Sequence, residues 1–318
     1  MKKMNLLCIS LLLVPAVIYG QKDGNPVLSY GDMDQWVTRK IHESKIIGGQ
    51  TRMLYELGPV QTIERNEPYT NLGGSPWASS NVMARVSGIT KTNTSVFPEK
   101  RNGGYCARME TRMEGVKVLG VININVLAAG SIFLGTMQEP VTSTKNPQKM
   151  IDSGIKFSDK PKAIRFDYKI KMSGERCRIR ATGFSKRSTV EGVDYPAVIL
   201  LLQKRREDND GNIYAQRVGT MVVRFDRTTE WQNGALFPIL YGDITKHPSY
   251  REEWMKIQVE ERYALNSRGK SVPIKETGWG KAEDVPTHMI LQFTSSHGGA
   301  YVGSPGNSMW IDNVELVY

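Results

Sequence analysis

The clearest pattern in the chain is a two-residue alternation of apolar and charged positions. In the stretch "AIRFDYKIKM", apolar side chains occupy every even position from Ile164 to Met172, and charged side chains occupy every odd position from Arg165 to Lys171. Side chains of a β-strand point alternately to its two faces. The alternation therefore predicts a strand over 163–172 whose apolar face packs on a core and whose charged face, Asp167 included, meets water.

Similar strand-like runs recur along the chain, and turn-rich pieces such as "DNDGN", "NGGY" and "GSPGNS" separate them. Gly, Asn, Asp and Pro favour turns. The further runs are "GYCARMET", "VININVL", "AVILLLQ", "RVGTMVVRF", "EWMKIQVEERY", "HMILQFTSS" and "MWIDNVELVY". Many strands without helical spacing between them indicate antiparallel sheets packed face to face. We therefore expect an all-β fold, an antiparallel β-sandwich or jelly roll.

The runs also suggest a domain organisation. Residues 73–318 contain most of them, and a β-sandwich of about 200–250 residues is common as one domain. Residues 21–72 alternate more weakly. We expect this N-terminal segment to be part of the same sandwich, and a separate small N-terminal piece is the alternative.

The last strand-like run allows two arrangements. If one parity holds throughout "MWIDNVELVY", Trp310 faces the core together with Asp312, whose carboxylate then needs a partner or a cation. A β-bulge at Asp312–Asn313 would instead turn Met309 and Ile311 inward and leave Asp312 outside. We favour the first arrangement.

The N-terminus predicts export. Its two lysines are followed by an apolar stretch from Leu6 to Tyr19 and then by Gly20. This stretch is too short to span a bilayer comfortably, and its order is typical of a secretory signal peptide over residues 1–20. No later stretch is long and apolar enough to form a transmembrane segment.

The charge of the chain limits the partners that it can be expected to bind. The formal net charge is +10, but no block of five or six like charges occurs. Together with export and the lack of a known nucleic-acid-binding motif, this argues against nucleic acid as a partner.

After cleavage Cys106 and Cys177 remain, and their alternation places them on different kinds of strand face. Either a disulfide or two separate thiols is compatible with the sequence.

Several segments, taken in order, resemble the PCMD ("putative carbohydrate metabolism domain") proteins of Bacteroidetes. They are "NGGYCARMET", "AAGSIFLGTM", "SGIKFSDKPKAIRFDYKIKM", "YPAVILLLQKR" and "THMILQFTSSHGGAYVGSPGNSMWIDNVELVY". The resemblance covers roughly Gly73 to Tyr318. It implies a jelly roll similar to galactose-binding and carbohydrate-binding modules, in an exported protein of the periplasm or cell surface of a Gram-negative bacterium. It also implies an association with glycan use.

The resemblance also suggests site residues. In "GSPWASSNV", Trp77 and Asn81 stand where the family has its tryptophan-containing segment, although a second tryptophan often present there is replaced by Pro76 or Ala78. Similar modules hold a structural calcium ion between an early segment and a carboxylate of the last strand. Asp312 fits that place by resemblance.

Asp34, or its neighbour Asp32 in "YGDMDQW", is the early candidate for this calcium site. Calcium takes six to eight oxygen ligands, several of which can be backbone carbonyls. The alternative is an Asp312 carboxylate satisfied by backbone amides.

Exposed aromatic rings are the usual platforms for sugars. Besides Trp77, the aromatic residues in loop-like surroundings are Trp231, Trp279 and Tyr301, and we treat them as candidate carbohydrate contacts. Each of them also suits a structural role. Trp254, in "EEWMKIQ", is interpreted as structural.

The sequence gives little support for catalysis. A glycosidase needs two carboxylates across a cleft, but Glu110, Asp167, Asp226 and Glu261 are interpreted as members of solvated strand faces. No G-x-S-x-G motif occurs, and the histidines lack metal-ligand spacing.

We therefore expect a non-catalytic protein that binds a polysaccharide or oligosaccharide, or supports glycan utilisation. A glycoside hydrolase is the first alternative. A cell-surface adhesion or assembly subunit with an envelope protein as partner is the second.

Overall fold

The computed structural model describes residues 21–22, 25–26, 28–86, 88–118, 122–143, 145–183 and 186–318. The predicted signal peptide lies outside these residues. Strands dominate this part of the chain, and its helical turns are α1 (Glu252–Met255), η1 (Lys45–Ile47), η2 (Leu72–Gly74) and η3 (Pro147–Met150). Within it, no helix is long and apolar enough to cross a membrane.

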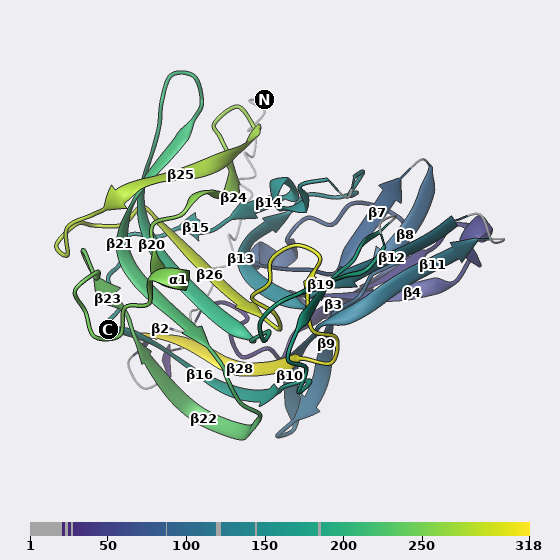
Figure 1. Cartoon of the computed structure of the whole chain (residues 1–318), viewed down its shortest axis with the longest axis horizontal. Coiled ribbons are helices and arrows are strands. Elements are labelled where there is room, and N and C mark those ends of the chain that lie inside the picture. Colours follow the sequence, from purple (N-terminus) through teal and green to yellow (C-terminus); the bar gives the residue numbers. More distant parts are fainter. Residues whose placement is uncertain are drawn as a thin grey trace, which may run out of the picture.

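Two large sheets form the body of the molecule (Figure 1). The five-stranded sheet has the order β22 (Thr229–Pro238), β16 (Ala163–Lys171), β28 (Ser308–Val317), β10 (Gly104–Glu110) and β9 (Val96–Arg101). The ten-stranded sheet has the order β14 (Ile151–Ser153), β13 (Ser131–Met137), β26 (His288–Thr294), β20 (Ala197–Glu207), β21 (Ile213–Arg224), β25 (Ser271–Trp279) and β24 (Val259–Leu265). Its remaining strands are β15 (Ile155–Lys156) on β26, β23 (Leu240–Tyr241) on β21 and β6 (Trp77–Ser79) on β13.

The core lies between these two sheets. Phe166 of β16 meets Phe293 of β26 edge to face, with ring centroids 5.1 Å apart, and both rings are fully buried. Each such ring contributes about 2–3 kcal/mol by leaving water. The neighbouring pairs in both sheets are antiparallel except β21 with β25. The predicted antiparallel β-sandwich is confirmed.

The ten-stranded sheet is buried on its second face as well. Along β20, Val198, Leu200 and Leu202 belong to the core between the sheets, whereas Leu201 belongs to a second apolar cluster on the opposite side. Met255 of α1 and Ala264 of β24 complete that second cluster. Burial on both sides explains why "AVILLLQ" is a continuous apolar run.

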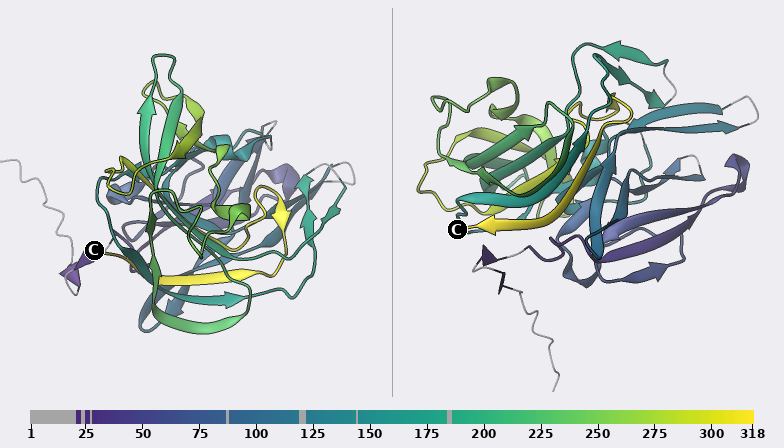
Figure 2. Two further views of the ribbon diagram at one scale, coloured as in Figure 1. Left: turned by 60° about the vertical axis from the view of Figure 1, so that its left-hand side comes forward. Right: turned by 90° about the horizontal axis from the view of Figure 1, so that it is seen from below.

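Smaller sheets extend the molecule to one side of the sandwich, as Figures 1 and 2 show. One contains β4 (Thr51–Leu57), β3 (Trp36–His42) and β5 (Gln61–Ile63), and another contains β7 (Val82–Val86) and β8 (Ile89–Asn93). Two more are β11 (Arg112–Val118) with β12 (Ile122–Ala128) and β18 (Thr182–Gly183), and β19 (Ser188–Val190) with β17 (Arg178–Arg180) and β27 (Val302–Gly303). The pair β1 (Gln21–Lys22) and β2 (Asn25–Pro26) lies elsewhere, with β2 beside β28 (Figure 1).

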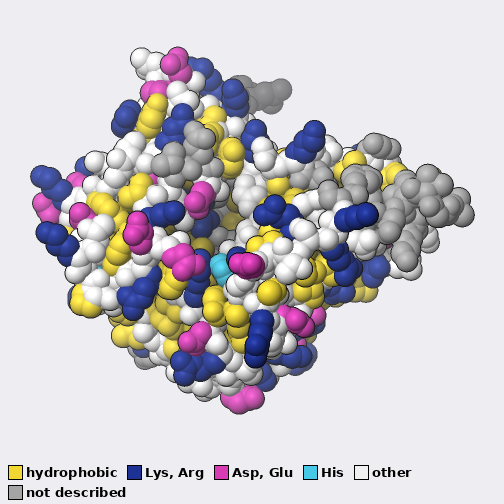
Figure 3. Space-filling view, in the orientation of Figure 1, with side chains coloured by type: hydrophobic (Ala, Val, Ile, Leu, Met, Phe, Trp, Pro, Cys, Tyr) yellow, Lys and Arg dark blue, Asp and Glu magenta, His cyan; other side chains and the backbone are white. Residues whose placement is uncertain are grey.

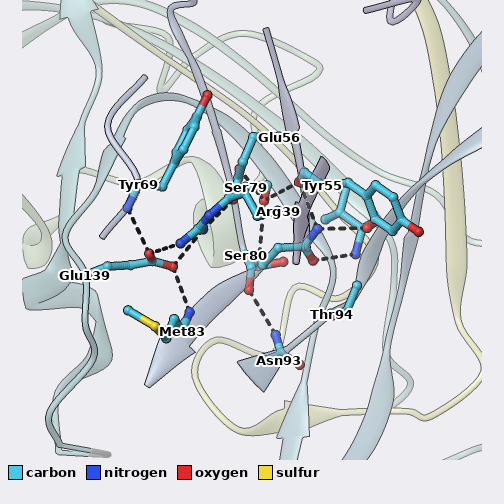
Figure 4. A network of polar contacts seen from close by, with 12 residues as sticks. Arg39, Tyr55, Glu56, Tyr69, Ser79, Ser80, Met83, Asn93, Thr94 and Glu139 are labelled. Carbon is cyan, nitrogen blue, oxygen red and sulfur yellow. Dashed lines mark hydrogen bonds and ion pairs between the residues drawn. The ribbon is translucent and has the colours of Figure 1, made fainter. Parts of the chain in front are cut away.

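A buried ion-pair network joins the N-terminal segment to the rest of the chain (Figure 4). The guanidinium of Arg39 on β3 lies 3.3 Å from Glu56 on β4 and 2.5 Å from Glu139, which follows β13. Glu139 also accepts the N–H groups of Tyr69 at 3.0 Å and Met83 at 2.7 Å. Burial raises the pKa of Glu56 to about 8, and the nearby Glu139 adds to this rise.

The last strand follows the bulged arrangement, so the parity that we favoured for it is wrong. Met309 and Ile311 face the core, and the register with β16 then slips, because Asp167 pairs with Asp312 but Arg165 pairs with Glu315. Asn313 takes a left-handed φ of 50° at the slip.

Asp312 nevertheless does not reach solvent. It is buried on the outer side of the five-stranded sheet together with Asp167, whose predicted exposure is therefore wrong. Both carboxylates accept hydrogen bonds from Arg101, at 2.9 Å in the case of Asp167. Desolvation by burial raises the pKa of Asp312, and Arg101 opposes that rise.

The two cysteines within the described residues, Cys106 and Cys177, are unpaired. Cys106 is buried and Cys177 is exposed, and neither forms a disulfide. Burial raises the pKa of the Cys106 thiol to about 12, so it behaves as a small apolar group.

Candidate functional site

A cavity of about 260 Å³ opens on the second face of the ten-stranded sheet. Its floor consists of side chains from β13, β20, β21 and β26, and its walls come from α1, the segment after α1, and β24. The space-filling view in Figure 3 shows this face hollowed near its middle, beside a histidine and acidic side chains. Ligand sites in proteins are usually concave in this way.

The alternation of side chains along β26 determines which of its residues form the floor of the cavity. In β26, Met289, Leu291 and Phe293 point into the core between the sheets. The alternate residues Ile290 and Gln292 therefore point to the opposite face, where both line the cavity. An amide group thus stands among apolar floor residues, which include Ile199, Val222 and Phe133.

A buried ion pair fixes the wall beside α1. Arg217 of β21 and Glu276 of β25 are both buried and form a salt bridge. Arg217 also donates to the carbonyl of Met255 at 3.2 Å, while Glu276 accepts the N–H of Gln258 at 2.8 Å. These bonds hold the segment from α1 to Gln258 against the sheet.

Aromatic and cationic groups line this wall. The ring of Trp254 is half-buried, and the guanidinium of Arg224 lies 4.5 Å from its centroid. Arg224 pairs with the exposed Glu253 at 2.9 Å. Tyr263 of β24 adds a second half-buried ring to the lining.

Polar groups inside the cavity keep hydrogen-bonding capacity. Nη1 of Arg262 donates to Oε1 of Gln292 at 3.0 Å, but the buried Nε of Arg262 has no hydrogen-bond partner among the described residues. The buried Oε1 of Gln258 likewise lacks one. Burial lowers the pKa of Arg262. One donor and one acceptor on lining residues thus lack partners among the described residues, and buried polar groups without partners are costly.

His297 and Ser296 stand at one end of the cavity without forming a catalytic pair. Nδ1 of His297 accepts the N–H of Tyr195 at 3.0 Å and lies 3.2 Å from Oδ1 of Asp194. The hydroxyl of Ser296 donates instead to the buried Asp194 at 2.8 Å. This geometry positions the loop before β27, and the hydroxyl of Ser296 points to Asp194 rather than to His297.

The predicted sugar contacts do not come together at this cavity. Trp77 is fully buried, and its Nε1 donates to the carbonyl of Ser29 at 2.8 Å. Asn81 is buried too, and its side chain bonds the backbone of Tyr55 and Val96. Both side chains are thus buried and hydrogen-bonded inside the protein.

The other three predicted contacts lie in separate places. Trp231 is half-buried on the outer face of the five-stranded sheet, where the guanidinium of Arg101 lies 3.9 Å from its ring centroid. Trp279 packs on the second apolar cluster beside Tyr250. Tyr301 is a turn residue with a φ of 63°.

The surroundings of Asp312 do not suit the predicted calcium ion. The Arg101 guanidinium binds both Asp312 and Asp167, and its positive charge occupies the place that a cation would take. Asp34 accepts the N–H of Tyr105 at 2.7 Å. Among the described residues, no group of three or more His, Cys, Asp or Glu side chains could hold a metal.

The sequence analysis missed the residues that line the cavity. Trp254 was interpreted as structural, yet it lines the cavity, as do Arg262 and Tyr263. Glu261 is exposed, as expected of a solvated strand face, and it lines the cavity too. One signal was available. Gln292 interrupts the apolar run "HMILQFTSS", and a polar residue in a strand buried on both faces calls for a polar partner or ligand.

Comparison with protein families decides the identity of the chain. Residues 60–317 match the model of the "Putative carbohydrate metabolism domain" family, PCMD. The chain belongs to the PCMD family. The predicted resemblance is confirmed, and the matched part includes every residue named above as lining the cavity.

Solved structures similar to this PCMD protein come from Bacteroides. A "putative glycoside hydrolase" from Bacteroides thetaiotaomicron is 19% identical with a TM-score of 0.43, covering 85% of this chain and 76% of the other. Another from Bacteroides vulgatus is 14% identical with a TM-score of 0.43, covering 83% and 91%. At this level of similarity the two structures carry no argument on the function of the PCMD protein. No curated protein matches the chain.

Proposed function

We propose that this PCMD protein binds a carbohydrate in the cavity between the ten-stranded sheet and the wall formed by α1 and β24. The observation that carries the proposal is the combination of two half-buried rings, Trp254 and Tyr263, with buried polar atoms that lack partners on Arg262 and Gln258. A sugar suits such a lining, because its C–H faces pack on aromatic rings and its hydroxyls donate and accept hydrogen bonds. Membership of a carbohydrate metabolism family agrees with this ligand class.

The binding is proposed to be non-catalytic, in an exported accessory protein of glycan utilisation. Glu253 at the cavity is engaged by Arg224, and the hydroxyl of Ser296 donates to Asp194 and not to a histidine. Neither arrangement supplies an activated nucleophile or a paired acid and base.

Calorimetric titration with a panel of oligosaccharides tests the proposal. Trp254→Ala should weaken binding of the best ligand at least tenfold, since stacking on a ring and the wall packing are lost together. Trp231→Ala is the matched control, because that tryptophan is also half-buried but lies on the five-stranded sheet. Equal losses in both variants, or binding that only Trp231→Ala weakens, would move the site away from the cavity.

A glycoside hydrolase is the second candidate, because two carboxylates, Glu253 and Glu261, line the same cavity. Release of reducing sugar that disappears in Glu253→Gln or Glu261→Gln would favour it. Binding without any release of reducing sugar favours the accessory protein.

A further inference from the structure

The charge balance inside the cavity goes beyond carbohydrate binding in general. Arg262 lines the cavity and forms no ion pair with any described residue, since its one side-chain hydrogen bond goes to the neutral amide of Gln292. Of the carboxylates whose charge acts on it, Glu276 is already paired with Arg217, and Glu261 is exposed to solvent. The side chain of Arg262 is therefore half-buried, with its Nε buried, and it has no counter-charge bonded to it among the described residues.

A second half-buried arginine, Arg205, adds positive charge near this place. Arg205 donates to the carbonyl of Ser153, a cavity residue, at 2.8 Å and to Oε1 of Gln203 at 2.9 Å, again without a carboxylate partner. Burial lowers the pKa of Arg205 to about 10; the charges of Asp152 and Glu276 oppose this fall, and the charge of Arg262 adds to it. Lys256, exposed at the same cavity, adds a third positive group outside any ion pair with described residues.

An unpaired buried charge is costly, and natural proteins seldom keep one without a partner. Arg224 shows the contrast within the same cavity, because Glu253 neutralises it. The missing counter-charge at Arg262 is best supplied by a ligand, and a planar carboxylate matches the planar, forked guanidinium.

We propose that the cavity selects glycans that carry uronic acid residues, and that the uronate carboxylate pairs with Arg262. This inference rests on the proposed carbohydrate binding and names the class of sugar. The carboxylate would pair with the guanidinium of Arg262, a lining residue whose Nε has no partner among the described residues, while Trp254 and Gln258 remain for the ring and its hydroxyls.

Matched ligands test the inference. Oligomers of galacturonate, of guluronate and mannuronate, and of glucuronate are titrated calorimetrically at low salt, each beside its carboxyl-reduced neutral form. A sulfated neutral oligosaccharide completes the panel. We expect at least one uronate oligomer to bind about tenfold or more tightly than its reduced form, which is the size of a charge-assisted hydrogen bond.

Arg262→Gln should abolish that preference, so that each uronate oligomer binds no more tightly than its carboxyl-reduced form. A near-UV circular dichroism spectrum like that of the parent protein reports that the fold around the cavity is intact. Its melting temperature without ligand should be unchanged or higher, because an unpaired buried charge is removed. Arg176→Gln is the matched control, since Arg176 is exposed and lies outside the cavity. It should keep the preference.

Each of the other possible outcomes contradicts one named part of the proposal. Equal binding of charged and reduced forms would overturn the uronate inference and leave carbohydrate binding standing. Tighter binding of the sulfated sugar than of every uronate would overturn the choice of carboxylate. If no member of any pair binds, the proposed function itself fails.

Discussion

Asp167 and Asp312 share one guanidinium although they come from different strands. Arg101 lies between them, and Asn313 donates to Asp167 at 2.9 Å. Removing either carboxylate leaves the buried guanidinium of Arg101 with one counter-charge instead of two. Asp312→Ala and Asp167→Ala should therefore lower the free energy of unfolding by similar amounts, about 2 kcal/mol each.

Urea denaturation measures both variants, with the exposed Asp226→Ala as the control that should change little. A large loss for Asp312→Ala alone would mean that Asp167 is solvated, as its alternation in the sequence predicts.

The same cluster makes a prediction about calcium. Because Arg101 already neutralises Asp312, excess chelator should leave the melting temperature of the protein unchanged. A fall of several degrees that added calcium reverses would restore the calcium site that the resemblance implies.

Glu56 gives the protein a pH dependence of a defined sign. Its pKa of about 8 when folded exceeds its ordinary value of 4.5, so the folded state binds a proton more tightly. The resulting stabilisation is complete below about pH 4.5 and is lost as the pH rises toward 8. When the pH is raised from 5 to 8, the melting temperature of Glu56→Gln should fall less than that of the parent protein. A larger fall in the variant would contradict this reading.

Single residues show where sequence reasoning stops. Alternation placed Asp167 on the outer side of its strand correctly, but the partner that buries it, Arg101, is 66 positions away in the chain. Nor does periodicity say whether a tryptophan faces a core or a cavity, since Trp77 and Trp254 both follow short polar segments. Such pairings depend on contacts between distant strands.

At the level of elements, the strongest alternation gave the most accurate prediction. The strand expected over 163–172 is β16 (Ala163–Lys171). The last strand was harder, because "MWIDNVELVY" has apolar residues on both parities, so either one supplies an apolar face. What decides is the left-handed Asn313, which allows Met309 and Val314 to face the same core.

The wall of the cavity depends on one pair of strands. Glu276→Ala should leave Arg217 buried and unpaired and release the N–H of Gln258, at a cost of about 3–5 kcal/mol in unfolding free energy. Sugar binding should weaken in parallel, when measured below the melting temperature of the variant.

The double variant Arg217→Met with Glu276→Leu should recover most of the stability, because no charge is then left buried. It should not recover sugar binding, since the bonds to Met255 and Gln258 stay broken. Full recovery of both properties would show that the ion pair does not position the wall.

The whole molecule explains why the fold is easier to predict than the site. Two-residue periodicity is a local property, and it was enough to indicate stacked antiparallel sheets. The cavity arises where α1 and β24 cover the second apolar face of the ten-stranded sheet, and this packing joins segments that are distant in sequence. Continuous apolar runs such as "AVILLLQ" indicate that other segments pack on both faces of the strand. They do not show which residues line the cavity between those segments and the sheet.

The central claim is that carbohydrate binds on this second face. The most direct measurement is a crystal structure of the protein with the best-binding oligosaccharide from the titrations. The account predicts electron density for a sugar ring against Trp254, with a hydrogen-bonding group within reach of Arg262 and Gln258. Density over Trp231 on the five-stranded sheet, with an empty cavity, would contradict it.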